Sequence, residues 1–367
     1  MPAIKPGVEP GTSQASLLPP KHRFSLTDTK MDKHISLAHG NGGRYMRELI
    51  AEIFARHLAD PEREWSLNVS LDAAPIALDG GEPYMTTDGF IVQPLEFPGG
   101  DIGSLAVNGT VNDLAVSGAT PRFLSLNAFI EEGLEIATLE RIVRSLAAAA
   151  QAAGVQVVAG DTKVLPRGEG GGLYLATTGV GLRPPGLKLG MEFIRPGDCI
   201  LVSGPVGDHG IAVMLAREDF EISGNVSSDC GHVIELAAAA RGFDGLRFMR
   251  DPTRAGLAGV CYEMAQNAGV TVRLRENDVP VRDAVRMVCE MLGYDPYYLA
   301  CEGRVVAVVA EEQADSLLET WRGIDAGAEA ALIGRIEEGA ARIVLETELS
   351  GERILDDLEE DPLPRIC

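Results

Sequence analysis

The spacing of apolar residues along the chain predicts a succession of helices and strands. From Arg44 to Leu58 and from Ile136 to Ala153, apolar side chains return every three or four positions, which indicates amphipathic helices. Gly154 follows the second stretch directly and is typical of a helix end. The same spacing predicts helices at 104–117, 209–217, 254–267, 281–291 and 314–322. Alternating or short continuous apolar runs predict strands at 65–76, 83–92, 123–129, 155–159, 173–182, 199–203, 270–274 and 304–309, with two more inside 331–344.

The order of these elements predicts an α+β protein with two domains. The first two strands read as a hairpin around the turn at 79–81, whereas strands and helices alternate beyond residue 186. The stretch 183–186, Arg-Pro-Pro-Gly, is the most linker-like part of the chain. We therefore expect a disordered extension at 1–31, an N-terminal domain at 32–183, a C-terminal domain at 184–346 and a flexible tail at 347–367.

Composition narrows the class of protein. The chain has 367 residues and a formal net charge of -22. This charge argues against nucleic acid or an anionic membrane as a partner, because both require clustered Lys and Arg. No apolar run is long enough to predict a membrane-spanning helix, and the first residues lack the apolar core of a signal peptide. The cysteines form no Cys-x-x-Cys pair, and all except the last lie among apolar residues, as in a reducing compartment. We expect a cytoplasmic protein.

Acidic and amide side chains recur at strand ends and helix starts in the N-terminal half. They are Asp72, Asp88, Asn112, Asp113 and Asp161. A buried carboxylate needs hydrogen-bond donors or a cation, and hard oxygen ligands favour Mg²⁺ that bridges the protein to nucleotide phosphates. The four aspartates are therefore predicted metal ligands, and Asp88, Asn112 and Asp161 are predicted nucleotide contacts. Taken singly, each could instead cap a helix or a turn.

Glycine-rich loops lead into several predicted helices. The first of them contains Gly40, Asn41, Gly42 and Gly43, between His39 and Arg44. Its backbone N–H groups and the helix N-terminus could hold anionic oxygen, although the loop matches no established phosphate-binding motif and could be an ordinary turn. A second loop, at 203–210, carries His209, which is either a nucleotide contact or a helix cap.

The chain ends in a thiol, Cys367, behind a tail rich in carboxylates and proline. Terminal residues are ordinarily replaceable, so an incidental cysteine is one interpretation. The stretch from Ser350 to Cys367 can nevertheless span about 55 Å at roughly 3.3 Å per residue. A thiol on such a tail could enter a cleft of its own chain or visit another protein.

The motifs together resemble one superfamily. The order GNGGR, TTDGF, VNDLAVSGATP, VVAGDTKV, PGDCILVSGPVGDHG, DPTRAGLAG and EGR is similar to that of the ATP-binding proteins that include aminoimidazole ribonucleotide (AIR) synthetase, selenophosphate synthetase and thiamine-monophosphate kinase. Within it, the HGNGGR loop and the PRIC terminus resemble the HypE family of hydrogenase maturation factors, over about residues 33 to 367. The resemblance implies a PurM-like fold, with an N-terminal mixed sheet and its helices forming the core of a homodimer, and a C-terminal α/β sandwich.

The resemblance also implies an activity, a carbamoyl dehydratase that makes the cyanide ligands of [NiFe]-hydrogenase. A HypF-like carbamoyltransferase would load Cys367, ATP and Mg²⁺ would drive the loss of water to a thiocyanate, and a HypC–HypD-like complex would accept the cyano group on iron. Lys163 and Glu302 match the positions that the family uses as the base, and Arg183 would bind phosphate or the tail's carboxylate. An ion pair for Lys163 and a capping role for Glu302 are the structural alternatives.

Two other functions remain open at this point. A small-molecule kinase or synthetase of the same superfamily would leave Cys367 idle and act on a diffusible acceptor. A non-catalytic carrier would ferry a group on the thiol without nucleotide turnover. Selenophosphate synthetase is disfavoured, because its glycine-rich loop carries cysteine or selenocysteine where this chain has Asn41 and Gly42.

Overall fold

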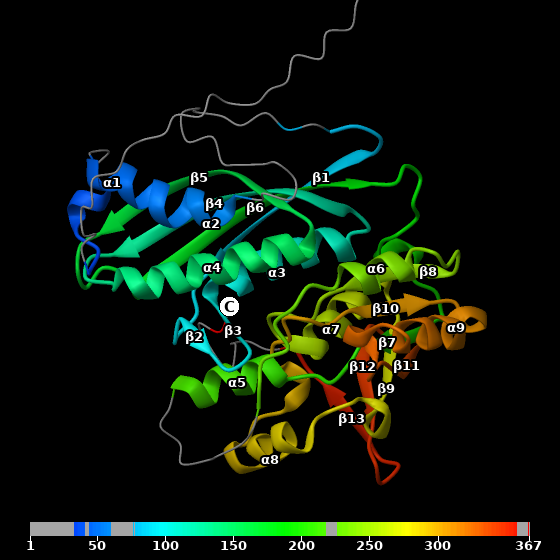
Figure 1. The fold of residues 1–367 in the computed structure, drawn as a ribbon. Helices are drawn as coiled ribbons and strands as arrows, with labels where there is room; N and C mark the ends of the chain where they lie inside the picture. Colours follow the sequence, from blue (N-terminus) through cyan, green and yellow to red (C-terminus); the bar gives the residue numbers. More distant parts are fainter. Residues whose placement is uncertain are drawn as a thin grey trace, which may run out of the picture. The chain divides into compact units, whose positions relative to one another are not determined.

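The computed structural model describes residues 33–40, 44–59, 76, 78–217, 226–357 and 366. The chain divides into two units, Met1–Asp32 and Lys33–Cys367, and all described residues belong to the second (Figure 1). Several predictions lie outside the described residues. They are the extension at 1–31, the strand at 65–76 except for its last residue, and the site residues Asn41, Gly42, Gly43, Asp72 and Cys367.

The N-terminal part forms a four-stranded sheet in the order β1-β6-β4-β5. β4 and β5 run parallel, and the other neighbours are antiparallel. Helices α3 and α4 cover one face of this sheet (Figure 1). The elements are η1 (Leu37–Gly40), α1 (Arg44–Leu49), η2 (Ile50–Ala55), α2 (Arg56–Leu58), β1 (Glu82–Phe90), β2 (Glu96–Phe97), β3 (Gly100–Asp101), α3 (Ile102–Val116), β4 (Thr120–Glu131), α4 (Ile136–Ala153), β5 (Gln156–Leu165) and β6 (Leu173–Arg183).

Helix α4 has the bounds that its sequence predicts. Its buried side chains form one stripe, and Gly154 ends it with a φ of 70°, a conformation that favours glycine. The stripe consists of Ile136, Leu139, Ile142, Val143, Leu146 and Ala150. Helix α3 differs, because it is buried on nearly all sides and packs against both the sheet and α4. Its first turn is fixed by Asp101, whose side chain accepts the N–H groups of Gly103 at 2.7 Å and Ser104 at 2.9 Å.

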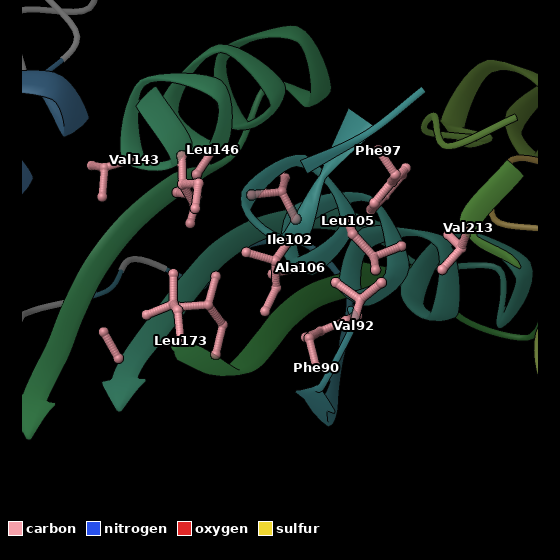
Figure 2. Packing of buried hydrophobic residues seen from close by; sticks show 14 of the residues in the cluster. Phe90, Val92, Phe97, Ile102, Leu105, Ala106, Val143, Leu146, Leu173 and Val213 are labelled. Atoms are coloured by element: carbon pink, nitrogen blue, oxygen red, sulfur yellow. The ribbon is translucent and has the colours of Figure 1, made fainter. Parts of the chain in front are cut away.

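One hydrophobic cluster joins the N-terminal sheet to the C-terminal part. Leu105 of α3 lies between Phe97 of β2 and the end of β1, where Phe90 and Val92 are located (Figure 2). Val213 of α5 faces the same group. Ile366, next to the end of the chain, belongs to this cluster. The last described residue of the tail is therefore part of a core.

The C-terminal part forms a seven-stranded sheet in the order β13-β12-β9-β11-β7-β10-β8. Only β12 and β9 run parallel among its described neighbours. The elements are η3 (Met191–Phe193), β7 (Cys199–Val202), α5 (Asp208–Arg217), α6 (Ile234–Ala240), β8 (Leu246–Arg250), α7 (Gly256–Ala268), β9 (Thr271–Arg275), η4 (Glu276–Asp278), α8 (Asp283–Leu292), η5 (Pro296–Tyr298), β10 (Val306–Val309), α9 (Glu311–Arg322), η6 (Asp325–Gly327), β11 (Ala331–Glu337), β12 (Arg342–Glu346) and β13 (Glu352–Leu355).

The fold class, α+β with two domains, agrees with the prediction. The predicted strand at 83–92 is β1, but its described partner is β6, and the expected hairpin partner at 65–76 lies outside the described residues. The C-terminal sheet continues past the expected domain end at 346, because β13 pairs with β12. Helix α6 and strand β8 were not predicted.

None of the helices in the described part of the chain has the length and apolar character needed to span a membrane.

Candidate active site

A cavity of about 670 Å³ opens beside β1, α3 and the end of β6, with β8 and the start of α7 on its other side. Its charged lining residues come from both halves of the chain. They are Asp88, Asp113, Arg183, Asp251, Arg254 and Glu302, together with Arg250. Four residues predicted from the sequence, Asp88, Asp113, Arg183 and Glu302, thus meet in one cavity.

The alternation of strand β1 brings Asp88 to the cavity. Thr86, Asp88 and Phe90 are more buried than their neighbours, because every second side chain turns toward α3. The Thr86 hydroxyl donates to Oδ2 of Asp113 on α3 at 2.7 Å. Burial and then the charge of Asp113 raise the pKa of Asp88 to about 6. Two carboxylates so close together favour a shared proton or a bound cation.

Asp251 adds a third carboxyl group, on the loop between β8 and α7. Burial, followed by the charge of Asp113, raises its pKa to about 7. Asp251 and Arg254 belong to the motif DPTRAGLAG, from which the sequence alone assigned no site residue. The charge of Arg254 acts in the opposite direction on Asp88, whose pKa it lowers. The cavity therefore combines concentrated negative charge with guanidinium groups at its wall.

Glu302 lies deepest among these acids. Its side chain is 2% exposed and its Oε1 atom has no hydrogen-bond partner. Burial, and then the charge of Asp229, raises the pKa of Glu302 well above its usual range. A buried carboxyl that lines a cavity and keeps one oxygen without a partner is suited to exchange a proton with a bound substrate.

A loop that we call the bridging loop, residues 226–233, fixes the backbone of Glu302. Oδ1 of Asp229 accepts the N–H of Glu302 at 3.0 Å. Asn112 of α3 donates from Nδ2 to the carbonyls of Gly231, at 3.0 Å, and Glu302, at 3.3 Å, while its Oδ1 accepts the N–H of Val233. Asn112 is predicted as a nucleotide contact, yet in the described structure it does not line the cavity and instead braces Glu302.

Arg183 lies at the end of β6, stacked on the ring of Tyr84 with 5.2 Å from its guanidinium carbon to the ring centre. Its Nη1 donates to the Tyr84 hydroxyl at 2.7 Å, and its Nη2 donates to the carbonyl of Leu187. The buried Nε has no partner. The guanidinium is thus held in one orientation at the wall of the cavity, with N–H donors beyond those that these bonds use.

Lys163 and Asp161 lie elsewhere. Both are on β5, at the opposite edge of the N-terminal sheet from Asp88 on β1, about three strand spacings or 14 Å away. Lys163 Nζ contacts Asp161 Oδ2 at 2.8 Å, and the two side chains are 58% and 52% exposed. The hydrogen bond from Lys163 lowers the pKa of Asp161. Within one chain this pair does not join the cavity.

Gly40, the first glycine of the glycine-rich loop, packs against the same strand as that pair. A Cβ atom at Gly40 would come within 2.8 Å of the backbone nitrogen of Val164, so only glycine fits against β5 here. The remaining loop residues lie outside the described part. Gly40 itself therefore lies against Val164, next to Lys163 on β5.

The described residues contain no group of three or more His, Cys, Asp or Glu side chains arranged to hold a metal ion by themselves. The chemistry of the cavity nevertheless fits a hard cation, since its carboxyl groups raise one another's pKa values and Glu302 keeps an oxygen free. A cation bound there would need oxygen ligands from a nucleotide, water or Asp72, as Mg²⁺ sites commonly do.

The end of the tail is attached to the bridging loop through His209. Nε2 of His209 lies 2.8 Å from the carbonyl oxygen of Ile366, and Nδ1 lies 2.8 Å from the Ser228 hydroxyl. Ile366 is 3% exposed. His209 therefore contacts the tail and is not a helix cap alone. Neither His209 nor Asp229 carries a sequence signal that reveals these contacts, because their partners are distant in the chain.

Comparison with known proteins gives a consistent result. The family of AIR synthase related proteins matches through its N-terminal domain at residues 70–183 and its C-terminal domain at 195–346. The chain is similar to carbamoyl dehydratase HypE of Azotobacter vinelandii, with 46% identity over 335 residues, 91% of this chain and 97% of that protein.

Solved structures show the same likeness. A crystal structure of hydrogenase maturation protein HypE in complex with ATP has a TM-score of 0.85 and 40% identity, and covers 90% of this chain and 99% of its own. A crystal structure of a HypE–HypF complex has a TM-score of 0.73 and 38% identity, with 86% and 99% covered.

Proposed function

The chain belongs to the HypE family of carbamoyl dehydratases, and we propose that it removes water from a carbamoyl group carried on its own Cys367, using ATP. The observation that carries this proposal is the docked tail. Ile366, the residue before Cys367, is buried and its carbonyl accepts from His209, which in turn contacts the loop that positions Glu302. The product is a thiocyanate on the same sulfur, which supplies the cyanide ligands of the [NiFe]-hydrogenase iron.

The residues of the cavity suit this reaction. The oxygen of an amide is a poor leaving group, and transfer of the γ-phosphoryl group of ATP converts it into phosphate, which leaves readily. Two protons must leave the nitrogen as the carbon–nitrogen triple bond forms, and phosphate departs with the former amide oxygen. Glu302, with its free buried oxygen and raised pKa, is the base that the cavity offers. Arg183 lines the cavity and is the proposed contact for phosphate.

Asp88 and Asp113 are the proposed protein ligands of Mg²⁺, with Asp251 close by. When bound, this ion would offset the charge of the acids and stabilise charge on the phosphoryl group. Burial, followed by the charge of Asp113, raises the pKa values of Asp88 and Asp251, and a bound cation would offset both effects, which supports this assignment. Asp72 and Asp161 stay predictions as ligands.

We further propose a homodimer formed through the N-terminal sheet. The face of the sheet opposite α3 and α4 has exposed apolar side chains, including Met85 and Phe129. Lys163 and Asp161 are also exposed in this part of the chain. In such a dimer, Lys163 and Asp161 of one copy could reach the cavity of the other copy. Lys163 would then be an alternative to Glu302 as the base.

The partners are proposed from the relatives. The structure of a HypE–HypF complex supports a HypF-like carbamoyltransferase that loads Cys367. A HypC–HypD-like complex as the acceptor of the cyano group, and a cytoplasmic location, remain predictions.

The test is mass spectrometry of the intact full-length protein after incubation with a HypF-like carbamoyltransferase, carbamoyl phosphate and ATP. We expect one carbamoyl group on the C-terminal peptide, which loses one water only when ATP is present. Cys367→Ser should acquire neither mass change. An adduct that persists with ATP would favour the carrier, and nucleotide turnover that is unchanged in Cys367→Ser and needs a diffusible acceptor would favour the kinase.

A further inference from the structure

The penultimate residue of the chain is held in place. A residue next to a terminus is ordinarily mobile unless specific contacts retain it. Ile366 is 3% exposed and shares a buried cluster with Phe97 and Val213. Its side chain is therefore anchored by packing, and its carbonyl group by a hydrogen bond to His209.

The contacts of His209 define one tautomer. A carbonyl oxygen only accepts hydrogen bonds, so Nε2 of His209 carries the hydrogen that Ile366 receives at 2.8 Å. Nδ1 then accepts from the Ser228 hydroxyl at 2.8 Å. Burial lowers the pKa of His209, which keeps the ring neutral. The edge of the His209 ring meets Phe97 at a centroid distance of 5.4 Å. The ring is thus fixed on several sides.

The same loop links this contact to Glu302. Ser228, which bonds His209, is followed by Asp229, which accepts the backbone N–H of Glu302 at 3.0 Å. The loop is itself held against the β2–β3 turn, because the N–H of Ser228 donates to the carbonyl of Pro98 at 2.8 Å. Two adjacent residues of the bridging loop thereby connect the end of the tail with the proposed base.

We propose that His209 is a positioning residue that holds the tail at Ile366 in register with Glu302, so that the group on Cys367 is presented to the cavity in one orientation. This rests on the proposed function for the nature of that group. At Ile366, the described residue of this end of the chain, one hydrogen bond and one buried side chain retain the tail, contacts few enough to be broken and formed again. His209 acts on the backbone of the tail and takes no part in proton transfer.

The test measures access to the tail directly. Full-length protein is treated with iodoacetamide, and alkylation of Cys367 is followed by mass spectrometry of the C-terminal peptide. The five other cysteines are free but buried or half-buried, which makes the terminal peptide the informative one. We expect His209→Ala to raise the alkylation rate by about tenfold, from the loss of one buried hydrogen bond and its packing. His209→Gln, which keeps a side-chain N–H donor near the position of Nε2, should recover most of the protection.

The serine pair supplies a matched control. Ser228→Ala removes the partner of Nδ1 and should raise the alkylation rate, whereas Ser227→Ala, at the exposed neighbour, should leave it unchanged. Ile366→Ala keeps the backbone carbonyl that His209 contacts and removes the buried side chain, so it tests the packing of the docked tail and should also raise the alkylation rate. Wild-type alkylation rates in both His209→Ala and Ile366→Ala would overturn the proposal.

A second measurement separates positioning from a general loss of structure. Dehydration of pre-carbamoylated protein in a single turnover should slow in His209→Ala by about the same factor, with unchanged ATP affinity. A matching loss of ATP affinity would show that His209 only supports the fold, and would overturn the proposal. If His209→Ala is alkylated faster but wild-type protein never loses water from its carbamoyl adduct, the role of His209 in docking stands and the proposed function fails.

Discussion

Asp229 supports Glu302 from behind the cavity. Oδ1 of Asp229 accepts the N–H of Glu302 at 3.0 Å, and Oδ2 accepts that of Gly303 at 3.2 Å. Nε of Arg304 lies 3.4 Å from the same carboxylate. Besides holding the backbone, the charge of Asp229 raises the pKa of Glu302, second only to burial. Asp229 thus both holds the backbone of Glu302 in place and contributes to the raised pKa of its carboxyl group.

Replacing Asp229 by asparagine should separate these two effects. Asp229→Asn removes the negative neighbour, so the pKa of Glu302 falls and the ionised form becomes available at lower pH. We expect the pH profile of single-turnover dehydration to move toward lower pH. The amide can replace only one of the two acceptors, which should lower the free energy of unfolding by roughly 1–2 kcal/mol.

Asp244→Asn is the control for this change, because it removes one charge from an exposed aspartate. Its profile should coincide with that of the wild-type protein. A wild-type profile in Asp229→Asn as well would show that Asp229 does not tune the reacting group.

The position of Lys163 leads to a prediction about subunits. Its ion pair with Asp161 is more than half exposed on both sides, and such pairs contribute about 0–1 kcal/mol. Lys163→Ala should therefore unfold at the same temperature as the wild-type protein. If Lys163 serves the cavity of a second copy, the variant should nevertheless lose dehydration activity.

Mixing two inactive variants tests whether the site is shared. In a randomised mixture of Lys163→Ala and Glu302→Gln chains, half the dimers are mixed and each of these has one intact site, which restores about a quarter of the activity. The double variant in one chain should restore none when mixed with itself. If the mixture is inactive, Lys163 of one chain and Glu302 of the other do not act together in one site.

The bridging loop packs closely against Gly99. It has a φ of +93°, and a Cβ atom there would lie 2.6 Å from the carbonyl oxygen of Ser228. Gly197 is a matched control, with a φ of +97° and open space around it. Both alanine variants incur a backbone penalty, but Gly99→Ala should lose a further 1–3 kcal/mol or so of unfolding free energy through overpacking. Equal losses in urea unfolding would contradict the close contact.

The sequence predicted best the bounds of the element with the clearest one-sided burial. Helix α4 was predicted with its observed bounds, since its apolar stripe faces the core and Gly154 ends it. Strand β13 was missed because only Leu355 of its four residues is buried, which leaves no alternation to detect. Helix α6 is a short run dominated by alanine, whose contrast between faces is weak.

The site could be predicted only in part, for a topological reason. Motifs identified Asp88, Asp113, Arg183 and Glu302, which meet at the cavity. They could not reveal that β6 and β4 separate β1, which carries Asp88, from β5, which carries Lys163. The order of strands in a sheet cannot be deduced from the spacing of residues within each strand. The contacts of His209 and Asp229 likewise depend on chain segments that are far apart in the sequence.

Asp251 should make the stability of the protein fall with rising pH. Its pKa is raised from 3.8 to about 7 by burial and then by Asp113, so the folded state retains a proton that the unfolded chain releases. The stabilisation is complete below about pH 4 and is lost as the pH rises toward about 7. Since Asp251→Asn has no such proton, its free energy of unfolding should gain roughly 3 kcal/mol relative to wild type over this interval. Urea unfolding curves at several pH values measure the difference, with Asp244→Asn as the control, and parallel curves for Asp251→Asn and wild type would contradict a protonated carboxyl in the cavity.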